Sequence, residues 1–135
     1  MKFSTILGLA AASAAPAASE DMVIDKLTLD SIHNHTIDYV YFELSGKNSG
    51  KNATGLICDV SNLVYPEPTH ATQCGNSKYY FQLLPGTDGH QYRLSILHDD
   101  DGLVLGSANV PTRCIRVRYG TLCGQKRDPV SISLV

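Results

Sequence analysis

The sequence predicts an all-β fold, an antiparallel sandwich or barrel. Three observations support this prediction. Apolar and polar residues alternate within short runs, turn-forming residues bound these runs at regular spacing, and no segment carries a convincing helical pattern. Alternation with a period of two is expected of a strand that buries one face, and many short strands separated by turns are typical of sandwiches and barrels.

The first two predicted strands cover residues 26–30 and 37–44. In the second of them, Val40, Phe42 and Leu44 share one face, and the residues between them occupy the other. The polar segment that follows is short enough to form a hairpin loop. The alternation therefore predicts a pair of half-buried strands at the start of the domain.

Five further predicted strands follow the same rule, each bounded by Gly, Pro, Asn or Asp. They cover residues 55–60, 79–84, 92–97, 102–108 and 129–135. A barrel of this size is expected to be filled by its own inward side chains. The expected core includes Val40, Phe42, Ile96, Ile132 and Leu134.

Residues 1–18 have the features of a secretory signal peptide. Lys2 supplies a basic start, residues 3–12 are apolar, and a small-residue cleavage region follows. The apolar run is shorter than the roughly 20 residues that a membrane-spanning helix needs. We therefore predict secretion without stable membrane insertion, and a single domain over residues 19–135.

Four cysteines follow the predicted signal: Cys58, Cys74, Cys114 and Cys123. An even cysteine count in a secreted chain predicts two disulfides. Four cysteines allow three connectivities, and spacing alone does not choose among them. We favour local pairing, because a turn at Tyr119–Gly120 would bring the second pair together across a hairpin.

The chain is mildly acidic, with 11 Lys and Arg residues against 13 Asp and Glu residues. This balance argues against nucleic acid or an anionic membrane as the main partner. Basic and aromatic residues nevertheless gather around the second cysteine pair: Arg113, Arg116, Arg118, Tyr119, Lys126 and Arg127. We predict that this cluster binds a partner protein, because Arg and Tyr are favoured at interfaces. The alternative is that these side chains only solvate a strand pair and its turn.

Two segments resemble metal sites, and we expect neither to hold a metal. His33 and His35 are spaced to share one face of a strand, but no third ligand lies near them, so solvated strand-end histidines are the preferred interpretation. Residues 98–102 gather oxygen ligands without the pattern of an EF-hand loop. An acidic turn between two strands explains them, and we expect no cofactor.

Nothing in the sequence selects a catalytic residue, so we expect no enzyme. No G-x-S-x-G motif is present, and cysteines held in disulfides are not nucleophiles. Carboxylates such as Glu43, Glu67 and Asp88 would need to meet in space to form a glycosidase pair. Two tripeptides match the N-glycosylation signal, at Asn34 and Asn52, and are candidate glycan sites in a secreted chain.

Several cysteine-containing and strand motifs resemble those of one family. They are Gly55–Cys58, Cys74–Gly75, Tyr79–Phe81, Ala108–Cys114, Cys123 and Ile132–Val135. Over residues 27–135 the chain resembles the Alternaria alternata allergen-like family of small secreted fungal proteins. The resemblance implies a compact, largely antiparallel β-barrel or sandwich-like barrel with two intramolecular disulfides in the local pattern, and no known catalytic residues.

The same resemblance implies a function in recognition. Family members are allergens or secreted proteins of plant-associated fungi that plants perceive, with defence or cell death as the response. The expected partner is a plant cell-surface or apoplastic defence protein, and the expected location is the host apoplast. The prototype has an additional cysteine near its mature N-terminus that links two subunits. No cysteine precedes Cys58 here, so we expect no disulfide-linked dimer.

Two function classes therefore remain open. The first is a secreted effector or elicitor that acts by binding. The second is a carrier of a small apolar ligand, or a cryptic hydrolase, because barrels can enclose a pocket. A packed interior would count against the carrier.

Overall fold

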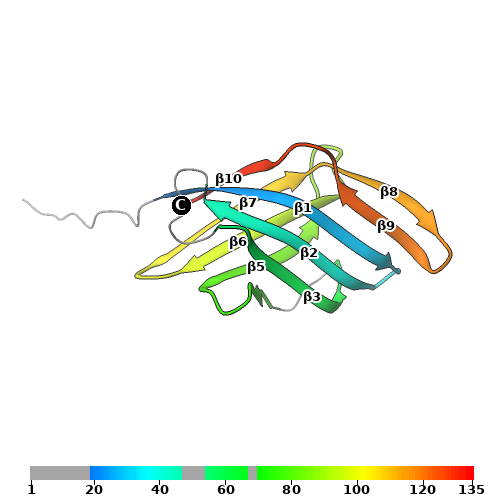
Figure 1. The fold of residues 1–135 in the computed structure, drawn as a ribbon, viewed down its shortest axis with the longest axis horizontal. Helices are drawn as coiled ribbons and strands as arrows, with labels where there is room; N and C mark the ends of the chain where they lie inside the picture. The colour runs from blue at the N-terminus through cyan, green and yellow to red at the C-terminus, as the bar shows by residue number, and fades with distance from the viewer. Residues whose placement is uncertain (1–18, 47–53, 67–69) are drawn as a thin grey trace, which may run out of the picture.

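The computed structural model describes residues 19–46, 54–66 and 70–135, and in this part it consists of β-strands and their connections (Figure 1). The predicted signal peptide, Asn52 and Glu67 lie outside the described residues. The strands are β1 (Glu20–Ile32), β2 (Thr36–Gly46), β3 (Leu56–Val64), β4 (Thr72–Gln73), β5 (Tyr79–Pro85), β6 (Tyr92–Asp99), β7 (Leu103–Val110), β8 (Thr112–Val117), β9 (Gly120–Gln125) and β10 (Val130–Leu134). No helix long and apolar enough to cross a membrane occurs among the described residues.

The strands form two antiparallel sheets. The larger sheet has the order β3-β2-β1-β9-β8, with β10 paired to β1, and the smaller has the order β4-β5-β6-β7. Val135 and Leu105 then exchange two backbone hydrogen bonds, of 3.0 and 3.1 Å, which join the end of β10 to β7. The predicted all-β fold is confirmed, in its sandwich-like form, with the two sheets joined along one margin.

Close backbone approach makes this joint possible. A Cβ atom added at Gly106 of β7 would collide with the carbonyl oxygen of Ser133 in β10. Because glycine has no side chain, β10 can lie directly against β7. The opposite margin, between β3 and β4, is closed by the Cys58–Cys74 disulfide, with a Cα–Cα distance of 4.3 Å.

The core lies between the two sheets. Phe42 of β2 meets Phe81 of β5 edge to face, with ring centroids 5.0 Å apart, so aromatic packing links the sheets. All five core residues expected from the sequence are buried. The interior is therefore filled by side chains from both sheets.

A bulge explains why β1 is longer than predicted. The pairing of β1 with β2 shifts between Asp25 and Thr28, and Lys26 has a φ of 60°. Ile24 is buried before the bulge and Leu27 after it, so the buried residues change from even to odd positions. The period-two pattern breaks there, and only the second part of the strand was predicted.

Candidate functional site

The β8–β9 hairpin carries the predicted cluster of basic residues and lies at one end of the molecule (Figure 1). Its strands pair so that Cys114 faces Cys123, and these cysteines form the second disulfide, with a Cα–Cα distance of 4.0 Å. The predicted local connectivity is therefore confirmed for both pairs. The turn lies at Arg118–Tyr119, one residue before the predicted position, because Val117 already pairs with Gly120.

The two faces of the hairpin separate residues that the sequence analysis grouped together. Cys123 is buried and Cys114 packs against the core, so their shared face points inward. Arg116 lies on this face, because it is two residues from Cys114. Arg113 and Ile115 lie on the opposite, outer face. Strand alternation therefore places Arg113 and Arg116 on different faces of the hairpin, and the binding of a partner by these residues stays a prediction.

The structure brings Arg113 together with the last residue of β9 and the residues that follow it. They surround a hollow of about 720 Å³, lined by Arg113, Gln125, Lys126, Arg127 and Asp128. The Gln125 side chain holds this region in place. Its carbonyl accepts a hydrogen bond of 2.9 Å from the Leu27 amide, and its amide donates to the carbonyl oxygens of Ile24 and Asp128.

A second, mostly apolar hollow of about 340 Å³ adjoins the first. It is lined by Thr28, Arg113, Ile115, Leu122, Cys123, Gly124 and Gln125. Gly124 pairs with Thr28 on one side and Arg113 on the other. A Cβ atom at Gly124 would meet nothing within 4 Å, so the missing side chain leaves the floor of the hollow open.

The basic side chains of the hairpin region are exposed, and none forms an ion pair with another residue in the described part of the chain. They are Arg113, Arg116, Arg118, Lys126 and Arg127. Ile115 and Tyr119 add exposed apolar surface, at 56% and 73%. Exposed and unpaired charges of one sign attract a partner of the other sign and accelerate its encounter.

His33 and His35 are exposed at the ends of two strands, as the preferred interpretation of solvated strand-end histidines expected, and they do not share a strand face. They lie in the tight turn between β1 and β2, where the His33 amide donates to the Thr36 carbonyl oxygen at 2.8 Å. The His33 Nε2 atom lies 3.7 Å from a carboxylate oxygen of Asp38. Asn34 is exposed in this turn, as a glycan acceptor must be. No three His, Cys, Asp or Glu side chains cluster as metal ligands within residues 19–46, 54–66 and 70–135.

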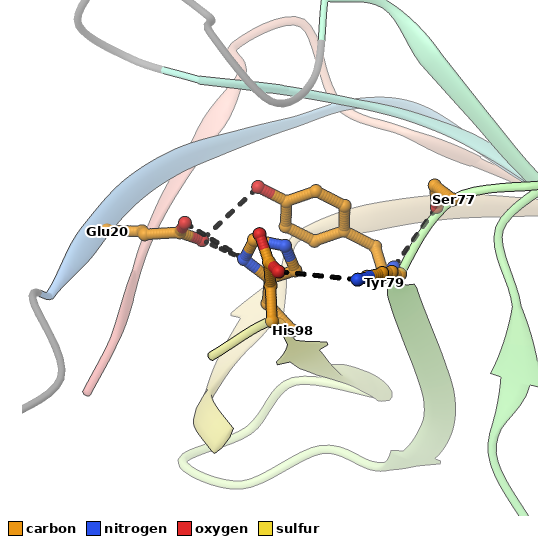
Figure 2. A network of polar contacts seen from close by, with 6 residues as sticks. Glu20, Ser77, Tyr79 and His98 are labelled. Carbon is orange, nitrogen blue, oxygen red and sulfur yellow. Dashed lines mark hydrogen bonds and ion pairs between the residues drawn. The ribbon is translucent and has the colours of Figure 1, made fainter. Parts of the chain in front are cut away.

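The segment from His98 to Gly102 contains an acidic turn between β6 and β7, as predicted, but His98 itself is buried. Its Nδ1 atom lies 2.9 Å from both carboxylate oxygens of Glu20, and the Tyr79 hydroxyl donates to the same carboxylate at 3.2 Å (Figure 2). The rings of Tyr79 and His98 are stacked with centroids 3.8 Å apart. These three residues connect the start of β1 to the smaller sheet.

Of the carboxylates considered for a glycosidase pair, Glu43 lies in β2, Asp88 lies between β5 and β6, and Glu67 lies outside the described residues. Glu43 contacts Lys26 at 3.6 Å and accepts a hydrogen bond of 2.7 Å from the Tyr41 hydroxyl. This hydrogen bond raises the pKa of Tyr41, with smaller contributions from burial and the nearby negative charge. Asp88 lies in the loop between β5 and β6, and no hydrogen bond or ion pair joins it to Glu43 among the described residues.

Comparisons with known proteins agree on one family. The model of the family described as Alternaria alternata allergen 1 matches residues 24–128. A curated relative, effector protein PevD1 of Verticillium dahliae, is 34% identical over 100 residues. That alignment covers 72% of this chain and 59% of the relative, so the chain spans about three fifths of the relative's length.

Two crystal structures of the Alternaria alternata allergen Alt a 1 resemble this fold. The first has a TM-score of 0.66 at 19% identity and covers 91% of this chain and 95% of that one. The second has a TM-score of 0.64 at 20% identity and covers 86% of this chain and 93% of that one. At these identities the likeness establishes the shared fold.

Proposed function

Because this chain belongs to the Alternaria alternata allergen 1 family, we propose that it is a secreted effector- or elicitor-type protein that acts by binding and not by catalysis. The relative named as an effector protein supports the effector class. The expected partner is a plant cell-surface or apoplastic defence protein with an acidic surface. Two disulfides and a predicted signal peptide fit secretion, because disulfides persist in oxidising compartments.

The observation that carries the proposal is the basic surface of the β8–β9 hairpin, whose charges form no ion pair with any residue that the structure describes. Its charges are exposed, and a disulfide clamps the strands that present them. A clamped hairpin loses less conformational entropy on binding than a flexible loop does. Arg and Tyr side chains at such a position have the chemistry of binding hot spots.

A second candidate, a carrier of a small apolar ligand, is favoured only by the hollow above Gly124. Its volume of about 340 Å³ lies within the range of small-molecule sites. The space between the sheets does not support a carrier, because buried side chains fill it. A ligand would therefore have to sit on the outer face of the hairpin.

Leaf infiltration with purified protein tests the proposal. The double variant Arg116→Glu and Arg118→Glu should need at least roughly tenfold more protein for the same defence or cell-death response, because it repels an acidic partner. The matched variant Arg116→Lys and Arg118→Lys retains the charge and should keep most of the response. Both should unfold at the wild-type temperature, because exposed substitutions change stability little.

Three outcomes separate the candidates. An unchanged response in the double Glu variant would remove the hairpin from the proposal, and no response to wild-type protein in several plant species would overturn the effector or elicitor function. Gly124→Val extends a side chain into the apolar hollow from a Cβ position that meets nothing within 4 Å. Loss of activity in this variant alone, with both Arg116 and Arg118 variants active, would favour the carrier.

A further inference from the structure

The free edge of β8 is an open hydrogen-bonding surface. In the larger sheet, β8 is the last strand, and within residues 19–46, 54–66 and 70–135 it pairs only with β9. A strand at the edge of a sheet leaves one row of backbone N–H and C=O groups without a neighbouring strand. Such an edge is where an extended peptide can add as a further strand.

The register identifies the groups on this free edge. The Lys126 amide donates to the Pro111 carbonyl oxygen at 2.9 Å, so these two residues form a hydrogen-bonded pair at the base of the hairpin. Hydrogen-bonded and non-hydrogen-bonded pairs alternate in an antiparallel ladder. Cys114 and Cys123, with Cα atoms only 4.0 Å apart, form a non-hydrogen-bonded pair. The backbone groups of Thr112, Cys114 and Arg116 therefore point away from β9.

The other sheet edges in the described part differ from this one. β7 is bonded to Val135 at the end of β10. β4 has only two residues, Thr72 and Gln73. β3 contains no Lys or Arg and carries the acidic Asp59. Only β8 combines an open edge with basic residues at its side and its turn.

We infer that the β8 edge binds an extended acidic segment of the partner as an additional β-strand. This inference rests on the proposed function and specifies how the partner is recognised. Main-chain hydrogen bonds to Thr112, Cys114 and Arg116 provide the pairing. Arg113 on the outer face and Arg116 on the inner face contact acidic side chains on both sides of the added strand, and Ile115 contacts an apolar one.

The same charges argue against a second copy of this chain as the occupant. Pairing of two β8 edges would place Arg113 and Arg116 of one copy beside those of the other. Like charges on adjacent strands are destabilising, and charged side chains are a common protection of edge strands against self-pairing. An acidic strand removes this repulsion.

Amide exchange measured by NMR tests the inference. The probe is a synthetic peptide of the length of β8 that repeats Asp-Val-Val, because aspartates three residues apart lie on opposite faces of an added strand, as Arg113 and Arg116 require. It should slow exchange of the Thr112, Cys114 and Arg116 amide protons by roughly tenfold or more at saturation, because these become hydrogen-bonded. The Arg113 and Ile115 amides already bond to β9 and should change little.

Two matched pairs separate strand pairing from charge attraction. A peptide N-methylated at two neighbouring central residues cannot pair along either edge and should bind at least roughly tenfold more weakly. The same peptide methylated at its two terminal residues should bind as before. In the protein, Thr112→Pro removes one outward N–H at the start of the strand, where proline is tolerated, and should weaken binding, whereas Thr112→Val should not. If Thr112→Pro fails to fold, the peptide pair still decides.

Binding without amide protection, equal binding of both methylated peptides, or no binding at all would overturn the inference. Protection that rises with protein concentration without peptide would show self-association and would overturn it as well. These results are distinct from failure of the proposed function. A loss of leaf response in the double Glu variant, together with equal binding of both methylated peptides, would leave the function standing and remove only this mode of recognition.

Discussion

The two disulfides stabilise very different regions of the molecule. Cys58–Cys74 lies at the margin of the sandwich, where both cysteines are fully buried and join β3 to the segment after β4. Cys114–Cys123 lies inside one hairpin and joins residues that already pair across it. The first bond connects the two sheets, and the second orders an exposed element. The body of the sandwich is therefore organised by burial, and the hairpin by local covalent constraint.

Core truncation should produce the largest difference between these regions. Phe81→Ala removes the ring that meets Phe42 and should lower the free energy of unfolding by about 3–5 kcal/mol. Ile115→Ala removes a side chain that is 56% exposed and should change it by about 0.5 kcal/mol or less. Denaturant titration followed by circular dichroism measures both. A large loss for Ile115→Ala would show that the hairpin belongs to the cooperative core.

Removal of each disulfide should come next in size. Replacing Cys58 and Cys74 by Ala should cost about 2–5 kcal/mol of global stability, since this bond closes the longer loop and joins the sheets. Replacing Cys114 and Cys123 by Ala should cost about 2 kcal/mol or less globally. Its main effect should be faster amide exchange in β8 and β9, because the hairpin opens locally. Uniformly faster exchange over all strands would contradict this distinction.

The contact between Glu20 and His98 should have a smaller effect. Glu20→Gln keeps the shape of the side chain and removes its charge, so we expect a loss of about 1–2 kcal/mol at neutral pH, measured by thermal denaturation. Asp21→Asn is the matched control. The side chain of Asp21 is exposed, and among the described residues its carboxylate accepts a side-chain hydrogen bond only from the Ser133 hydroxyl. It should change stability by about 0.5 kcal/mol or less. Equal losses would mean that the contact of half-buried Glu20 with buried His98 adds nothing to stability.

Most of the sandwich could be predicted from the sequence because its strands alternate regularly. The residues expected in the core are buried, and both disulfides have the local connectivity. The first part of β1 was missed because the bulge at Lys26 changes which positions face inward. A single inserted residue disrupts the period-two signal, although the strand continues.

The candidate site was less predictable, because it depends on strand parity and on contacts distant in sequence. The basic residues near Cys114 were recognised, but their division between two faces follows from the pairing register. Glu20 and His98 are 78 residues apart, and no local pattern links them. The open edge of β8 follows from the order of strands in the sheet, which alternation alone does not determine.

The two margins of the sandwich are closed by different means. At one margin, β10 joins β7 through backbone contacts that Gly106 permits. The opposite side is held by the Cys58–Cys74 bond. Of these two connections, a thiol reductant breaks only the disulfide. In a reducing environment the two sheets are therefore released from each other along that margin, while the joint of β10 with β7 stays intact. Because disulfides persist in oxidising compartments and are reduced in cytosol, this margin is held covalently only in oxidising surroundings.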